Sequence, residues 1–210
     1  MIRWMAAAAV VLACSATGSA RQDRPLSPPG TATAMVGGEW GKDAEGNAVY
    51  QGGKWIEVIY SRPMLRQRTS IFGSGAEYGV AVRAGTPLWR AGANQTTVLK
   101  TEVPLVFGGT TVPAGEYGVL IELRVPTAWT LILSRQPRQT QFDAANKTDL
   151  IGAVNHNPSF DVARIPMQVN SKVQQRIEQL TFMFLDVTRT GGKLALAWDH
   201  TQASVEFKVG

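Results

Sequence analysis

Short apolar stretches separated by turn residues recur along most of the chain. In Val205-Glu206-Phe207-Lys208-Val209, apolar and polar side chains alternate with a period of two, which places one set on the buried face of a strand. Helical periodicity is largely missing, and a short helix is expected only at Ser171–Gln179. The pattern predicts strands near Ile56–Tyr60, Thr97–Thr101, Tyr117–Leu123, Trp129–Leu133, Val162–Val169, Leu180–Val187, Leu194–Trp198 and Val205–Val209.

Turn residues between these stretches favour hairpins. Gly108-Gly109 and Gly191-Gly192 supply the positive φ angles of tight turns, and Val112–Gly115 adds a proline and a glycine. Strands at this spacing without long helices predict an all-β fold, specifically an antiparallel β-sandwich that is jelly-roll-like. A polar stretch at 136–157 is expected to be a long loop excursion. Trp40 and Tyr50 flank a turn-prone segment, so Glu39–Gly53 is expected to form an additional hairpin.

The N-terminal residues resemble an export signal. Met5 to Ala13 form a short apolar run after a single positive charge. Two processing outcomes stay open: residues 1–20 form a cleaved signal peptide, or a lipoprotein leader ends before Cys14, the lipidation candidate. Residues 21–35 are rich in proline and poor in apolar side chains, which predicts a flexible tether. Residues 36–210 are then a single β-sandwich domain.

Composition limits the cellular location and the binding partners that the sequence predicts. Cys14 is the only cysteine, so the chain has no internal disulfide and depends on its hydrophobic core. The net charge is +5, but no dense block of lysine and arginine occurs. Export predicts a periplasmic, outer-membrane-anchored or extracellular protein, with no nucleic-acid partner and no membrane contact other than a lipid anchor at Cys14.

Several separated motifs carry a family resemblance. They are YSRP (60–63), IFG (71–73), WRAGAN (89–94), VPAGEYG (112–118), AWTLILS (128–134) and ALAWD (195–199). The chain resembles secreted bacterial proteins catalogued only as a domain of unknown function, over about Val36 to Val209. It departs from the family pattern at Glu39–Gly53, which looks inserted, and at Gln67, where a glycine is expected. The resemblance implies a secreted or lipid-anchored β-rich domain, but no activity or site residues.

The densest polar and aromatic positions suggest a ligand site. Arg62, Arg90 and Asn94 are candidates for a recessed anion or sugar site, because guanidinium groups offer a planar fork of donors. Tyr60 and Trp89 are candidates for stacking faces. A structural interpretation stays open, in which Trp89 fills the core and Arg90 pairs with a carboxylate or with carbonyls.

No catalytic constellation emerges from the sequence. Two histidines, His156 and His200, are too few for a typical zinc site, so no metal and no cofactor are expected. The leading hypothesis is a non-catalytic envelope module that binds a small ligand, a glycan or an envelope protein. The alternative is a hydrolase of carbohydrates or esters that uses His156 or loop carboxylates, namely Asp143, Asp149, Asp161 and Asp199.

Overall fold

The computed structural model describes residues 25–210. The predicted leader, Cys14 and residues 21–24 of the predicted tether lie outside the described residues. In the described part of the chain, no helix has the length and apolar character that a membrane-spanning helix needs. Eleven strands, one α-helix and two 3₁₀ helices make up the described elements: β1 (Pro29–Lys42), β2 (Ala48–Ser61), η1 (Gly75–Glu77), α1 (Val80–Arg83), β3 (Thr97–Thr101), β4 (Leu105–Phe107), β5 (Thr110–Val112), β6 (Gly115–Val125), β7 (Ala128–Ser134), η2 (Pro158–Phe160), β8 (Asp161–Asn170), β9 (Ile177–Thr188), β10 (Gly191–Asp199) and β11 (Thr201–Val209).

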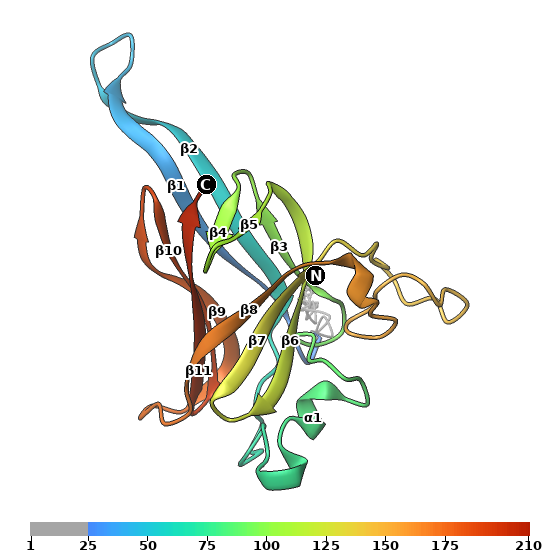
Figure 1. Cartoon of the computed structure of the whole chain (residues 1–210). Coiled ribbons are helices and arrows are strands. Elements are labelled where there is room, and N and C mark those ends of the chain that lie inside the picture. The colour runs from blue at the N-terminus through green and yellow to red at the C-terminus, as the bar shows by residue number, and fades with distance from the viewer. Residues whose placement is uncertain (1–24) are drawn as a thin grey trace, which may run out of the picture.

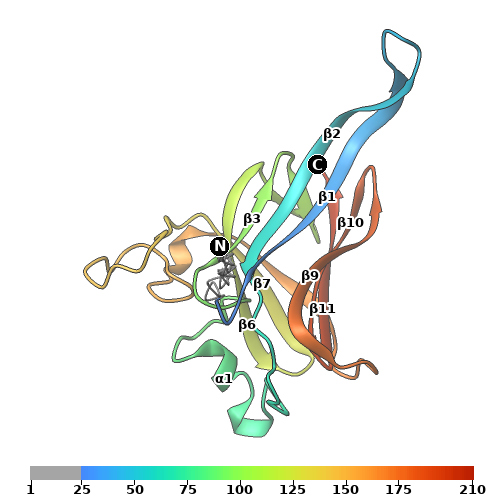
Figure 2. The ribbon, with the colours of Figure 1, turned by 180° about the vertical axis from the view of Figure 1, so that it is seen from behind.

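The strands form one antiparallel sheet that curls until it is nearly barrel-shaped (Figures 1 and 2). Its order is β1-β2-β3-β6-β7-β8-β11-β10-β9, and the short strands β4 and β5 extend it beside β11. The two ends of this order approach each other where Gly37 N–H of β1 donates to the Arg189 carbonyl just after β9 (2.8 Å). The segment after β2 also bonds to β9, since Leu65 N–H donates to the Glu178 carbonyl (2.8 Å) and Leu180 N–H donates to the Pro63 carbonyl (3.0 Å). The all-β prediction is confirmed. A jelly-roll-like sandwich is not confirmed, because the strands follow one another in a single curled sheet.

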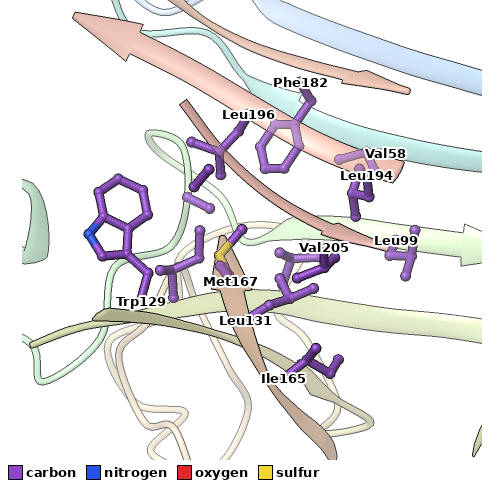
Figure 3. Close-up of a cluster of buried hydrophobic side chains, with 14 of the residues drawn as sticks. Val58, Leu99, Trp129, Leu131, Ile165, Met167, Phe182, Leu194, Leu196 and Val205 are labelled. Atoms are coloured by element: carbon purple, nitrogen blue, oxygen red, sulfur yellow. The ribbon is translucent and has the colours of Figure 1, made fainter. Parts of the chain in front are cut away.

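Alternating side chains from all round the sheet meet inside it. In β11, Val205 and Phe207 are buried while Glu206 and Lys208 are exposed, as the period of two predicts. Side chains from opposite strands interdigitate in the interior, which Figure 3 shows for residues such as Leu99 of β3, Leu131 of β7 and Leu196 of β10. This packing supplies the hydrophobic stabilisation that a chain without internal disulfides needs.

An aromatic cluster closes the end of the interior next to α1. The ring of Phe72 lies 5.0 to 6.1 Å from the rings of Trp89, Trp129 and Trp198, measured between centroids. Trp129 Nε1–H donates to the Tyr78 hydroxyl at 2.7 Å. Burial raises the pKa of Tyr78, and the hydrogen bond from Trp129 partly offsets that rise. The β2–β3 connection, residues 62–95, therefore packs into the sheet as a cap.

The polar excursion 136–157 is an ordered loop that covers the outer face of β6 and β7. Under it lies a second apolar cluster formed by Leu88, Leu120, Ile132, Leu150 and Ala153. Buried amide side chains organise the loop: Gln136 Nε2 donates to the carbonyls of Thr148 and Asn155, and its Oε1 accepts from Asn157 N–H. These bonds satisfy backbone groups that no strand partner reaches.

Two sequence predictions about element boundaries are wrong. Strand β1 begins at Pro29, so residues 29–35 of the predicted tether are strand, because Thr31, Ala32 and their neighbours pair in register with β2. A proline at the first position of a terminal strand costs no ladder hydrogen bond. Ser171–Gln179 contains no helix, since its backbone bonds to other segments, as Val173 N–H does to the His200 carbonyl, and β9 begins at Ile177.

The hairpin expected at Glu39–Gly53 is the outer part of the β1–β2 hairpin, which projects well beyond the body of the protein (Figures 1 and 2). Trp40 is 73% exposed and packs edge to face against Tyr50, with 5.5 Å between ring centroids. The turn at its tip is held by Asp43, whose Oδ1 accepts from the backbone N–H groups of Glu45 and Asn47.

Removing the Tyr78 hydroxyl tests how far the aromatic cluster depends on its one internal hydrogen bond. Tyr78→Phe leaves the buried indole N–H of Trp129 without an acceptor, so we expect the free energy of unfolding to fall by about 1–3 kcal/mol. Urea unfolding measures this change. Tyr50→Phe is the matched control, because the Tyr50 hydroxyl bonds to the Gly37 carbonyl on the projecting hairpin, where water can replace it. Equal losses in the two variants would contradict the expectation.

Candidate functional site

The cap formed by residues 62–95 contains a recess of about 300 Å³. We call it the Arg90 recess. Its polar lining includes Arg68, Arg90 and Asn94, and Trp89 and Trp198 also line it. Pro63, Ile71, Ala81, Val82 and Ala84 contribute apolar surface. The volume is at the lower end of the range for small-molecule pockets.

Backbone geometry places Arg90 in the recess. Trp89 and Ile121 exchange two backbone hydrogen bonds of 2.8 Å, so residue 89 is held against β6 before β3 begins. The chain then turns sharply through Ala91 and Asn94, whose φ angles of 48° and 59° lie in the left-handed region. This turn brings the Asn94 carbonyl to 2.8 Å from Nη1 of Arg90. Asparagine tolerates that conformation better than most residues do.

The guanidinium of Arg90 also packs on the backbone of the excursion. A Cβ atom at Gly152 would lie 2.8 Å from both Cζ and Nη1 of Arg90, and the φ of Gly152 is +63°. Thr96 Oγ1 donates to the Gly152 carbonyl at 3.2 Å and so holds this glycine in place. A side chain at position 152 would therefore displace the arginine.

Arg90 is a half-buried cation without a carboxylate partner. Within residues 25–210 it forms no salt bridge, and its one hydrogen bond is to the Asn94 carbonyl. Burial lowers the pKa of Arg90 below its ordinary value, but an arginine stays charged at neutral pH. In the same part of the chain, Nε and Nη2, the edge that can pair bidentately with a carboxylate, have no hydrogen-bond partner.

Arg68 is a second cation in the recess. Its Nε donates to the Leu65 carbonyl at 2.9 Å and its Nη2 to the Met64 carbonyl at 2.5 Å. Its guanidinium carbon lies 5.8 Å from the centroid of the Trp198 ring, which is a cation–π distance. The preceding residue Gln67 has a φ of 67°, the left-handed conformation that a glycine would favour. The sequence prediction did not include Arg68 among the site residues.

The five predicted ligand-binding residues separate into two groups. Trp89, Arg90 and Asn94 line the recess, whereas Tyr60 and Arg62 do not. The Tyr60 hydroxyl accepts from Phe182 N–H at 3.0 Å inside the sheet. Arg62 packs over Gly30, and its Nε is buried without a hydrogen-bond partner in the described residues.

Trp89 offers no free stacking face. It is 1% exposed and packs in parallel on Trp198, with 6.2 Å between ring centroids. Phe72 and Trp129 contact it edge to face. The structure therefore supports the core interpretation for Trp89.

The residues of the hydrolase hypothesis are already engaged in separate structural contacts. His156 Nε2 lies 2.8 Å from Asp161 Oδ1, and Asp161 Oδ2 accepts from Arg164 at 3.0 Å. Asp199 accepts from Arg176 at 2.9 Å. Asp143 and Asp149 accept hydrogen bonds within the excursion: Asp143 Oδ1 from Ala145 N–H, and Asp149 Oδ2 from Asn146 Nδ2. Across residues 25–210, no group of three or more His, Cys, Asp or Glu side chains is placed to hold a metal ion.

Comparisons with known proteins identify a family whose function is unknown. The family model described as protein of unknown function (DUF2911) matches residues 44–207. No curated protein and no solved structure matches the chain. Strand β1 precedes the matched region, whereas both arginines of the recess lie within it.

A glycine substitution tests the packing of Arg90 on the excursion. Gly152→Ala places a methyl group against the guanidinium in addition to the strain of a left-handed alanine, which costs about 1–2 kcal/mol. Gly75→Ala is the matched control, because Gly75 has a φ of +55° and no atom within 4 Å of the added Cβ. We expect Gly152→Ala to lower the free energy of unfolding by about 1 kcal/mol more than the control, since it also breaks the bond to Asn94.

Urea unfolding in two backgrounds completes this test. In an Arg90→Met background the guanidinium is absent, so Gly152→Ala is expected to cost no more than Gly75→Ala. If the excess cost persists in that background, Arg90 and Gly152 are not in the contact described.

Proposed function

We propose that this chain, which belongs to the DUF2911 family of proteins of unknown function, is a non-catalytic binding module of the bacterial envelope that takes a small anionic ligand in the Arg90 recess. The location in the envelope rests on the export signal at the N-terminus, whether residues 1–20 are cleaved or Cys14 is lipidated. The choice of a binding role rests on the recess.

The single observation that carries the proposal is the uncompensated charge of Arg90. A cation removed from water costs free energy unless it is paired and hydrogen-bonded. Arg90 is half-buried and has one carbonyl partner in the described residues. A ligand anion at its Nε/Nη2 edge would form two charge-assisted hydrogen bonds with the guanidinium. Binding sites commonly keep such a local cost for the sake of function.

The charge of the whole cap supports an anionic ligand. Residues 62–95 contain five arginines, one glutamate, and neither lysine nor aspartate. A surface with one sign of charge attracts oppositely charged ligands and speeds their association. Arginine is also the side chain best suited to planar recognition of carboxylate and phosphate. The cap therefore favours a ligand with one of these groups over a neutral glycan.

The hydrolase alternative has one observation in its favour, the close pair of His156 and Asp161. A general base of this kind acts on a nucleophile or on a water molecule near the substrate. Within residues 25–210 no hydroxyl or thiol is hydrogen-bonded to His156, and His156 does not line the Arg90 recess. The pair fits a structural role in fixing the start of β8.

A thermal-shift measurement tests the proposed binding. The full mature protein is screened with acetate, butyrate, succinate, phosphate and sulfate at equal ionic strength. At least one of them is expected to raise the melting temperature, because a ligand at about 100 times its Kd adds ~2.7 kcal/mol to the free energy of unfolding. Arg90→Met should abolish the shift while the unliganded protein stays folded.

Arg66→Met is the control for the loss of one positive charge. Arg66 lies in the same connection and donates to the Leu26 carbonyl at 3.0 Å, but it does not line the recess. This variant should keep the shift. Unfolding of Arg90→Met would support the structural interpretation instead, and equal loss in both variants would point to unspecific attraction of anions.

A further inference from the structure

Arg68, the second cation of the recess, narrows the chemical class of ligand that the recess can bind. Arg68 is fixed by its own segment, since Nε and Nη2 donate to the carbonyls of Leu65 and Met64. These contacts leave Nη1 without a protein partner in residues 25–210. The backbone carbonyl of Arg68 also accepts a hydrogen bond from Arg176, and Arg176 donates a second one to Asp199 at the end of β10. Arg68 therefore offers a positioned donor rather than a freely moving charge.

The two arginines pack against different parts of the fold. Arg90 packs on Gly152 of the excursion, outside β6 and β7. Arg68 lies over Trp198, at the end of β10. Each guanidinium is thus positioned by a different part of the fold, and a ligand that fills the recess meets two separate cationic groups.

No acidic side chain balances these charges in the recess. Its lining residues include neither aspartate nor glutamate among the described residues. The nearby carboxylates are engaged elsewhere: Glu178 accepts from Arg66 N–H at 2.8 Å, and Asp199 accepts from Arg176. Two cations without a facing anion match a ligand with two negative charges better than a ligand with one.

Small apolar side chains also line the recess. Ala81, Val82 and Ala84 come from the α1 region, and Ile71 and Pro63 come from the turns before it. The recess has a volume of about 300 Å³. Such a space accommodates a short hydrocarbon chain between two charged ends. A compact anion such as phosphate would leave the apolar surface uncovered.

We propose that the ligand of the Arg90 recess is a small aliphatic dicarboxylate, with one carboxylate on Arg90 and the other on Arg68. This inference rests on the proposed function, because it assigns the chemistry of the same recess. The Nε/Nη2 edge of Arg90 takes the first carboxylate bidentately, and Nη1 of Arg68 takes the second. The chain between them covers the small apolar side chains of the α1 region.

Isothermal titration calorimetry with short acids tests this assignment. The probes are malonate, succinate, glutarate and adipate, with butyrate as the matched monocarboxylate and inorganic phosphate as the compact anion. We expect at least one dicarboxylate to bind about tenfold or more tightly than butyrate, which is the gain from one further charge-assisted contact. Arg68→Gln should reduce that dicarboxylate to the affinity of butyrate and leave butyrate binding unchanged.

Two further variants keep the test decisive. Arg68→Lys retains the charge but loses the carbonyl contacts that fix the side chain, so it should recover part of the preference for the dicarboxylate. Arg66→Gln removes a charge from the same segment outside the recess and should change neither affinity. If Arg68→Gln does not fold, the Arg68→Lys result and the comparison of probes on the wild-type protein decide the question.

The outcomes separate the two proposals. If dicarboxylates bind no more tightly than butyrate, or if Arg68→Gln weakens both equally, the dicarboxylate assignment is wrong while anion binding at Arg90 stands. Preferential binding of phosphate would assign the recess to a compact anion instead. If no probe binds the wild-type protein, the proposed function itself fails.

Discussion

The backbone bridge between Trp89 and Ile121 is the interaction on which the recess depends. Its two hydrogen bonds hold the β2–β3 connection against β6 at a point where β3 has not yet begun. The indole of Trp89 then lies inside the aromatic cluster, where its contacts with Phe72, Trp129 and Trp198 fix it on several sides. The backbone at Arg90 therefore starts from a position that these contacts define.

A rigid position for Arg90 is what makes a binding role physically reasonable. Ligand affinity falls when flexible side chains must be ordered on binding. In this protein the entropic cost of ordering Arg90 is met during folding, through the core packing of Trp89, the turn at Asn94 and the close approach of Gly152. The curled sheet thus serves as a scaffold, and the cap and the excursion supply the polar groups, which is a common division between sheets and their loops.

Much of the sheet could be predicted from the sequence, because the period of two is a local property of each strand. Strand β11 is the clearest case, since Val205 and Phe207 point inward and Glu206 and Lys208 point outward. The curl of the sheet could not be predicted, because it depends on pairing between residues far apart, such as Leu65 with Glu178. The first part of strand β1, residues 29–35, could not be predicted, because its threonines and alanines give a weak apolar signal.

The candidate site was only partly predictable for the same reason. Arg90 and Asn94 are neighbours in sequence and stay neighbours in the recess. Tyr60 and Arg62 belong to the same polar and aromatic region of the sequence. The alternation of side chains along β2 nevertheless places Tyr60 in the core. Arg68 joins the recess through contact with Trp198, a residue 130 positions later. No rule of residue spacing along the chain predicts a contact between residues so far apart in sequence.

The most direct measurement of the central claim is an NMR titration that observes the arginine Nε–Hε signals of the wild-type protein, assigned with single arginine variants, as succinate is added. The account predicts that the signal of Arg90 moves saturably and that of Arg66 does not. Equal, unsaturated drift of all arginine signals, or no movement of the Arg90 signal at any concentration of anion, would contradict it.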